Sequence, residues 1–284
     1  MKDMKTVILT DSGCDVPEEF VKEHHIKVLR LRVTYSEASY RDGLDLDPRE
    51  IYKRFSQEVP KTSTPTMQDF YDIVDEIKAE GYEKVIGIFI SSKLSSTCQT
   101  AKMVLDEQED LQSFVLDTKN ISVGSGLVAM WAAVQLENGM PYEEICEKLP
   151  EKAKKSNVFF YMDTLEYLRK GGRIGAVTSV VGSLLKIKPI ISCNEEGEYY
   201  TVEKIRGAKA GVSKLIELAS NFTEGKPSWL ALMNGGAPEA AENTKPTVIR
   251  EIANGTIVAQ DQIAGTLAVH TGPGLLGIGV LVDP

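Results

Sequence analysis

Short apolar runs alternate with longer amphipathic segments along the first half of the chain. Lys84–Ile90 is apolar after its first residue, as expected of a central strand covered on both faces, whereas in Met67–Glu80 the apolar residues recur at helical spacing. The predicted strands are Thr6–Thr10, Ile26–Thr34, Lys84–Ile90, Gln112–Asp117 and Val158–Met162. The predicted helices are Pro48–Gln57, Met67–Glu80, Cys98–Glu107, Leu127–Glu137 and Tyr142–Lys155. The alternation predicts a three-layer α/β domain with a parallel sheet over residues 1–163.

Two helix starts carry capping signals. Thr66 and Asp69 have the spacing of a capping box, which predicts that the helix Met67–Glu80 begins there. Asp15, followed by Pro17 and Glu18, is predicted to cap a short helix after the first strand.

Beyond Ile191 the pattern changes to one of strands that are expected to pair as antiparallel neighbours. A hairpin is predicted from Pro189–Cys193 to Glu198–Ile205 through the turn Asn194–Gly197. The remaining predicted strands are Trp229–Met233, Thr256–Gln260, Leu267–His270 and Gly277–Val282, and the helices are Ala208–Asn221 and Glu239–Ala253. We therefore predict a C-terminal α+β domain over residues 164–284.

Composition narrows the class of protein. With 42% hydrophobic and 26% charged residues the chain is typical of a globular protein, and its net charge of −9 argues against nucleic acid as a partner. The four cysteines are scattered and only three histidines occur, so neither a metal centre nor a cofactor is expected. No apolar run is long enough to span a membrane, and the charged start leads straight into a strand, so we expect a cytoplasmic protein.

Hydroxyl side chains gather at two junctions that lead into helices. Lys61–Thr66 precedes one helix, and Ser91–Thr97 lies between a strand and the next helix. One hydroxyl is enough to cap a helix, so both clusters exceed that need. Free backbone amides at the start of a helix favour a bound anion. Neither cluster requires a neighbouring cation, so we interpret the hydroxyls as donors that bind a carboxylate without reacting with it.

Two further features have both a functional and a structural explanation. Arg169, Lys170 and Arg173 surround Gly171-Gly172, which is either a joint with a charged face towards an anion or a solvated basic turn. His270, predicted at the end of a strand, is either a ligand contact or a core histidine bonded to the backbone.

Sequence patterns of common enzymes are missing or misleading. Gly272–Gly277 matches G-x-G-x-x-G, but too few residues follow for the helix and acidic residue of a dinucleotide site. Neither a G-x-S-x-G elbow nor a phosphate-binding loop occurs. A spatial triad of Ser95, His270 and Asp11 stays open, so the alternative function is a serine-dependent hydrolase or transferase of a small acyl substrate.

Six blocks, in this order, resemble the DegV family of bacterial fatty-acid-binding proteins. They are Asp11-Ser12, Lys61–Pro65, Ser91–Ser95, Leu168–Gly175 (LRKGGRIG), Leu184–Ile190 (LLKIKPI) and His270–Gly274 (HTGPG). The resemblance implies two domains with a lipid tunnel between or beside them that encloses one long-chain fatty acid. It also implies a non-enzymatic carrier that presents this ligand to the catalytic subunit of a fatty acid kinase, which forms an acyl phosphate for phospholipid synthesis.

The same resemblance assigns site residues. The implied carboxylate contacts are Thr62, Ser63, Ser92, Ser95 and His270, and the implied hand-off residues towards the kinase and its phosphate are Arg206 and His270. Thr64 and Ser96 stand where the family often has glutamine and glycine.

Overall fold

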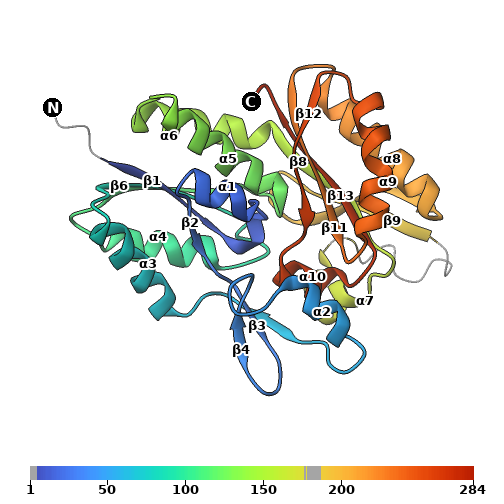
Figure 1. Cartoon of the computed structure of the whole chain (residues 1–284), viewed down its shortest axis with the longest axis horizontal. Helices are drawn as coiled ribbons and strands as arrows, with labels where there is room; N and C mark the ends of the chain where they lie inside the picture. The colour runs from blue at the N-terminus through green and yellow to red at the C-terminus, as the bar shows by residue number, and fades with distance from the viewer. Residues whose placement is uncertain (1–4, 176, 178–186) are drawn as a thin grey trace.

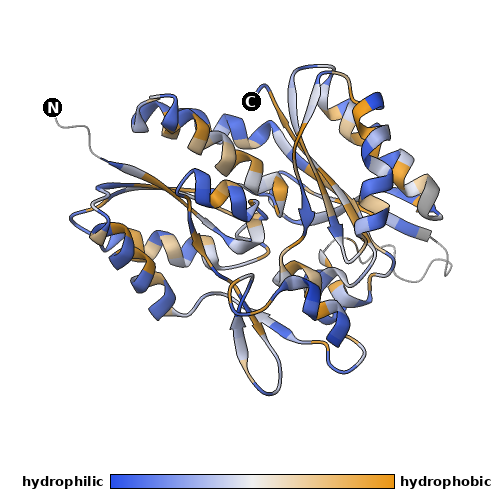
Figure 2. Ribbon diagram, in the orientation of Figure 1, coloured by the Kyte–Doolittle hydropathy of each residue, from blue (hydrophilic) through white to orange (hydrophobic). Residues whose placement is uncertain are grey.

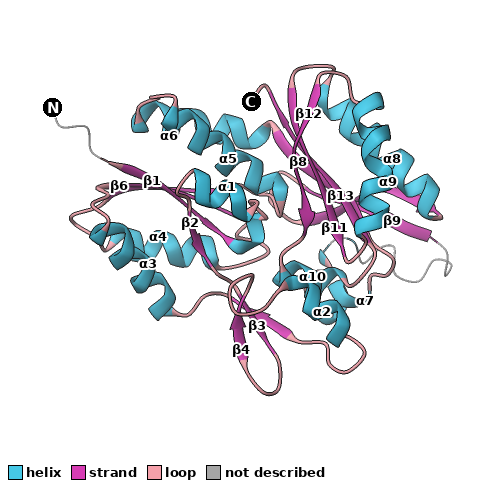
Figure 3. Cartoon of the chain, viewed as in Figure 1, coloured by secondary structure: helices cyan, strands magenta, loops and turns pink. Residues whose placement is uncertain are grey.

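The computed structural model describes residues 5–175, 177 and 187–284. Its strands form a 4-stranded sheet, a 6-stranded sheet beside it, and a 3-stranded sheet at one edge of the molecule (Figures 1 and 3). Helices cover the outer faces of the large sheets and also lie between them. The predicted mixed α/β architecture, with a parallel N-terminal sheet and a separate second sheet, is confirmed.

The first sheet is parallel throughout and lies between two layers of helices. Its order is β2-β1-β6-β7, formed by β1 (Thr6–Asp11), β2 (Lys27–Leu29), β6 (Lys84–Phe89) and β7 (Gln112–Asp117). One face packs on α3 (Met67–Ala79) and α4 (Thr97–Asp106), and the other on α1 (Glu18–Glu23), α5 (Val123–Glu137) and α6 (Tyr142–Lys154). Every residue of β6 is buried, so its prediction as a central strand is confirmed.

Capping explains where α3 begins. The Asp69 amide donates to Thr66 Oγ1 over 3.2 Å, and the Thr66 amide donates to the Asp69 carboxylate over 2.7 Å. The predicted capping box is confirmed. In Figure 2, α3 and α9 (Pro238–Glu251) carry both orange and blue, as expected of helices with one face on a sheet.

The second sheet is mixed and takes one strand from the first half of the chain. Its order is β10-β9-β8-β13-β11-β12, formed by β10 (Tyr199–Arg206), β9 (Ile187–Cys193), β8 (Ser156–Tyr161), β13 (Leu275–Val282), β11 (Ser228–Gly235) and β12 (Gly255–Gln262). Only the β11–β12 pair is parallel within this sheet as described, and the hairpin β9–β10 was predicted correctly. The domain boundary after residue 163 stays a prediction, and β8 pairs within the second sheet although it precedes that boundary.

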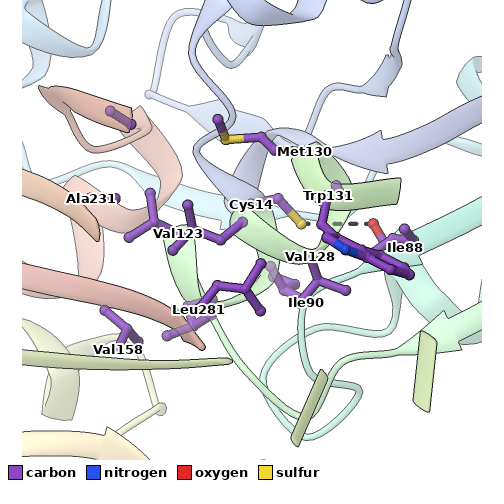
Figure 4. Close-up of a cluster of buried hydrophobic side chains, with 14 of the residues drawn as sticks. Cys14, Ile88, Ile90, Val123, Val128, Met130, Trp131, Val158, Ala231 and Leu281 are labelled. Carbon is purple, nitrogen blue, oxygen red and sulfur yellow. Dashed lines mark hydrogen bonds between the residues drawn. The ribbon is translucent and has the colours of Figure 1, made fainter. Parts of the chain in front are cut away.

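Helix α5 joins the two large sheets. All residues from Val123 to Ala133 are buried, whereas α8 (Ala208–Thr223) and α9 cover the opposite face of the second sheet. Figure 4 shows the cluster around α5; the labelled α5 side chains are Val123, Val128, Met130 and Trp131, beside Ile88 of the first sheet and Val158, Ala231 and Leu281 of the second. A helix that is apolar all round is buried all round, and α5 fits that rule.

Two small residues set how closely α5 approaches its neighbours. A Cβ on Gly126 would lie 2.1 Å from the carbonyl oxygen of Cys14, and a Cβ on Gly279 of β13 would lie 2.5 Å from Val123. The first of these contacts involves backbone, which cannot turn away as a side chain can.

The small sheet holds the elements that the sequence analysis predicted least well. It has the order β4-β3-β5, formed by β3 (Arg32–Thr34), β4 (Ser39–Arg41) and β5 (Lys61–Ser63), and it lies near α2 (Pro48–Arg54), α7 (Glu166–Lys170) and α10 (Gly265–Thr271). The single strand predicted over Ile26–Thr34 is wrong. The Leu31 amide donates to Ser12 Oγ over 3.0 Å, and the chain leaves the first sheet there to enter the small sheet.

The strand predicted over Leu267–His270 is also wrong, because this segment belongs to helix α10. The Asp42 carboxylate accepts the amides of Gly265 and Thr266, each over 2.8 Å, and so caps the first turn of the helix.

The predicted cap at Asp15 is wrong as well. Helix α1 begins at Glu18 after Pro17, with no side-chain cap. The Asp15 carboxylate instead accepts the amide of Ala264, 2.7 Å away, at the start of α10. Burial raises the pKa of this carboxyl to about 8.

We predict that Gly126→Ala lowers the free energy of unfolding by roughly 1–3 kcal/mol, since the added methyl would overlap the Cys14 carbonyl. Alanine is the better helix former by about 1 kcal/mol, so an unconstrained site would show the opposite sign. Equilibrium unfolding in urea measures the difference. Unchanged or increased stability would show that α5 does not depend on this close approach.

Candidate functional site

A mostly apolar cavity lies where the first sheet, the second sheet and α10 meet. Its apolar lining comes from all three: Leu31, Ile90, Leu94, Ile121, Val158, Phe160, Tyr199, Met233, Ile263, Leu267 and Leu275. The space between the lining residues is about 820 Å³, counting the part that opens to solvent. A concave, mostly apolar enclosure with a few polar side chains is the usual form of a small-molecule site in proteins.

The two hydroxyl clusters meet at this cavity. Thr62, Ser63 and Thr64 reach it from β5 and the residue after it, and Ser95 reaches it from the loop between β6 and α4. The Ser95 hydroxyl lies 2.9 Å from the Thr97 hydroxyl, and the Ser63 hydroxyl donates to the Thr64 carbonyl over 3.2 Å. Residues more than thirty positions apart in sequence thus line the same cavity.

His270 lies beside Thr62 in the lining. Its Nε2 is 2.8 Å from Thr62 Oγ1, which is a hydrogen bond. Its Nδ1 is buried and has no hydrogen-bond partner in the described part of the chain. Burial, with a smaller effect of the nearby Arg173 charge, lowers the pKa of His270 to about 4, so the imidazole is neutral at neutral pH.

Arg173 is the one cation of the basic turn that lines the described cavity. Its Nη1 donates to the carbonyl of Gly171 over 2.8 Å, and its Nε donates to the carbonyl of Leu94 over 3.4 Å. Both acceptors are neutral, and no carboxylate within the described ranges pairs with this guanidinium. Lys170 instead pairs with Glu166 over 2.6 Å and is exposed. The basic turn signalled an anion-facing group, but sequence reasoning did not single out Arg173 as a site residue.

Ser92 lies in an adjoining depression instead of the cavity lining. That depression shares Leu94, Ser95, Arg173 and Tyr199 with the cavity and adds Ser92, Lys93 and Ser96, among others. The Ser92 amide donates to the Asp117 carboxylate over 3.3 Å. Ser92 and Ser96 therefore line the adjoining depression, whereas Thr64 lines the cavity.

Arg206 lies outside both the cavity and the adjoining depression. It is the last residue of β10, is exposed, and pairs in the sheet with Ile187. It is not among the described residues that line the cavity or the depression.

The hydrogen bonds of the structure do not connect Ser95, His270 and Asp11 as a triad. Asp11 is buried and accepts the amides of Gly13 and Ile90, over 2.8 and 3.1 Å, and burial raises its pKa to about 7. His270 bonds Thr62, and its other nitrogen has no partner among the described residues. This arrangement lacks the base–orienter pair that activates a serine.

Residues 5–175, 177 and 187–284 contain neither a candidate metal site nor a candidate membrane-spanning helix. No group of three or more histidine, cysteine, aspartate or glutamate side chains in these ranges is arranged to hold a metal ion. No helix there is long and apolar enough to cross a membrane.

Comparison with known proteins gives the family. Residues 5–283 match the family model described as "Uncharacterised protein, DegV family". A DegV domain-containing protein of Clostridium acetobutylicum is 40% identical over 274 residues, which make up 96% of this chain and 98% of that protein.

Solved structures agree with this match. A structure described as fatty acid binding of a DegV family protein from Thermus thermophilus is 28% identical, has a TM-score of 0.90, and covers 98% of this chain and 100% of its own. A stearic acid-binding protein from Eubacterium ventriosum is 26% identical, with a TM-score of 0.89 and coverage of 97% and 98%. The resemblance carried by the six sequence blocks is confirmed, and the chain belongs to the DegV family.

Proposed function

We propose that this protein binds a long-chain fatty acid. The alkyl chain lies among the apolar side chains of the cavity, and the carboxylate lies beside the hydroxyls of Thr62, Ser63 and Ser95. The observation that carries the proposal is a mostly apolar cavity whose lining also contains the hydroxyls of Thr62, Ser63 and Ser95, together with His270 and Arg173. The described structural relatives from Thermus thermophilus and Eubacterium ventriosum bind fatty acids, which supports the same ligand class here.

Physical magnitudes favour a long chain over a short one. Burying a methylene gains about 0.8 kcal/mol, so roughly 14 methylenes give on the order of 10 kcal/mol before other costs. A carboxylate removed from water costs several kcal/mol unless donors replace the lost water. Hydroxyl donors on Thr62 and Ser95 would supply those interactions, as would the charge of Arg173, which pairs with no carboxylate among the described residues.

We further propose that the protein is a carrier without chemistry of its own. It presents the carboxylate to the catalytic subunit of a fatty acid kinase in the cytoplasm, and the resulting acyl phosphate serves phospholipid synthesis. The open depression beside Ser95 and Arg173, which adds Ser92 and Lys93, supports this proposal because an incoming phosphoryl group needs access from solvent. Arg206, exposed on β10, is the proposed contact with the kinase or its phosphate.

Native mass spectrometry tests the ligand. We expect protein purified gently from a bacterial host to carry a mass increment that matches one long-chain fatty acid, released on denaturation. A mass equal to that of the bare chain, with no binding of added palmitate, would refute fatty acid binding. Labelling of Ser95 by a serine-directed phosphonate would instead support the hydrolase alternative.

The carboxylate position is tested by Thr62→Ala and Ser95→Ala. Each should lose roughly 1.5–3 kcal/mol of palmitate binding, because a charge-assisted hydrogen bond is removed. The double variant should lose less than the sum, since both hydroxyls would serve one anion. Thr100→Ala is the matched control, because this hydroxyl donates to the Ser96 carbonyl and lines neither the cavity nor the depression. A double variant within twofold of the wild type would place the carboxylate elsewhere.

The hand-off to the kinase is tested by Arg206→Ala and His270→Ala. We expect Arg206→Ala to retain fatty acid but to form little acyl phosphate with a purified fatty acid kinase catalytic subunit. His270→Ala should reduce turnover more than it reduces binding. Arg250→Ala, which removes another exposed arginine on α9, is the control. Normal turnover in both test variants would reject the hand-off roles.

A further inference from the structure

The two adjacent glycines of the basic turn are required for different reasons. Gly172 has a positive φ of 72°, and an added Cβ there would meet nothing within 4 Å. Gly171 has an ordinary helical φ of −79°, which any residue can adopt. An added Cβ on Gly171 would, however, lie 2.0 Å from Nδ1 of His270. Gly171 is therefore constrained by the imidazole and not by its own backbone.

The geometry of this contact shows which way the ring nitrogen points. The position of the added Cβ lies 2.0 Å from Nδ1, 2.6 Å from Cε1 and 3.3 Å from Cγ of His270. These three distances place it close to the ring plane, on the outer side of Nδ1, where a hydrogen on Nδ1 would point. One of the two Cα hydrogens of Gly171 occupies the same direction, because it takes the place of the missing Cβ.

Only one tautomer of the neutral imidazole is compatible with that arrangement. A hydrogen on Nδ1 would collide with the Cα hydrogen of Gly171, whereas a lone pair on Nδ1 can accept a weak C–H contact from it. The absence of any other partner for Nδ1 within the described residues agrees with a lone pair there. The ring hydrogen is then on Nε2, which faces Thr62 Oγ1 at 2.8 Å.

We propose that Gly171 is a positioning residue that holds His270 in the Nε2–H tautomer, so that the hydroxyl hydrogen of Thr62 is free to donate to the ligand. This inference rests on the proposed function, since it assumes that the ligand group beside Thr62 is a carboxylate. His270 donates to the Thr62 oxygen, and Thr62 in turn donates outward. In the other tautomer Nε2 would accept the Thr62 hydrogen, and the threonine would present only lone pairs to an anion.

The proposal has a consequence for ligand class. A Thr62 hydroxyl that is obliged to donate favours a ligand head that only accepts hydrogen bonds, which is an ionised carboxylate. A long-chain alcohol can accept one such bond but lacks the charge that Arg173 would meet. Burial favours the neutral state of His270, so the direction of its hydrogen bond to Thr62 stays the same through the neutral pH range.

Nitrogen-15 NMR on histidine-labelled protein tests the tautomer directly. The chain has three histidines, so the His270 signals are assigned by their loss in His270→Ala. We expect an unprotonated Nδ1 and a protonated Nε2 between pH 6 and 8, with and without one equivalent of palmitate. A protonated Nδ1 would overturn the proposal. Failure of palmitate to bind while the expected tautomer is observed would refute the proposed function and leave the tautomer assignment standing.

Substitution tests the role of Gly171. Gly171→Ala should weaken palmitate binding at least tenfold and abolish the wild-type His270 signals. Gly172→Asn, in the same turn, should retain both, because asparagine tolerates a positive φ and the site has room. Wild-type signals and affinity in Gly171→Ala would overturn the positioning role.

A second comparison covers the case in which Gly171→Ala does not fold. In a His270→Ala background the overlap is gone, so adding Gly171→Ala should leave the midpoint of thermal unfolding unchanged. An equal loss of stability in both backgrounds would show that the imidazole contact is not the reason for the glycine, and would overturn the proposal.

Discussion

The burial of α5 between two sheets is the interaction on which the rest of the structure depends. Each large sheet has one face covered by helices that also meet solvent, whereas the facing sides of both sheets share α5. The close approach at Gly126 holds the helix against the loop after β1. Ile121 and Ser122, immediately before the helix, line the cavity, so the packing that joins the sheets also sets one wall of the site.

Among the described polar residues of the cavity lining, Arg173 is the one that carries a charge at neutral pH. The histidine is neutral, the hydroxyls are uncharged, and the guanidinium of Arg173 is held by two carbonyl oxygens instead of a carboxylate. A buried ion pair would have to be broken before a ligand could replace the acid, at a cost of several kcal/mol. The two carbonyl partners orient the arginine, and no carboxylate in the described part of the chain neutralises its charge.

An element could be predicted from the sequence when the interactions that form it lie within a few residues of one another. The start of α3 was predictable because Thr66 and Asp69 are three residues apart and cap the helix by themselves. The buried strand β6 was predictable because its apolar residues are consecutive. Helix α10 was mispredicted because its cap, Asp42, is over 200 residues away in the chain and its apolar residues resemble those of a strand.

The candidate site likewise has features that the sequence indicates locally and features that depend on contacts between distant segments. The hydroxyl clusters and His270 stood out by residue type, and the structure places Thr62, Ser63, Ser95 and His270 in one lining. That Arg173 and not Lys170 faces the cavity depends on which carbonyls lie within reach after folding, and no sequence pattern contains that information. The dependence of His270 on Gly171 is of the same kind, because it joins segments roughly a hundred positions apart.

The strand order of the second sheet has a consequence for the timing of synthesis. The last strand in the chain, β13, lies in the middle of that sheet, where it separates the group β10-β9-β8 from the group β11-β12. On the ribosome the first sheet can form early from consecutive β/α units, but these two groups have no strand between them until β13 emerges. Leu275 and Gly277 of β13 line the cavity, so its lining cannot be complete until this last strand has been synthesised.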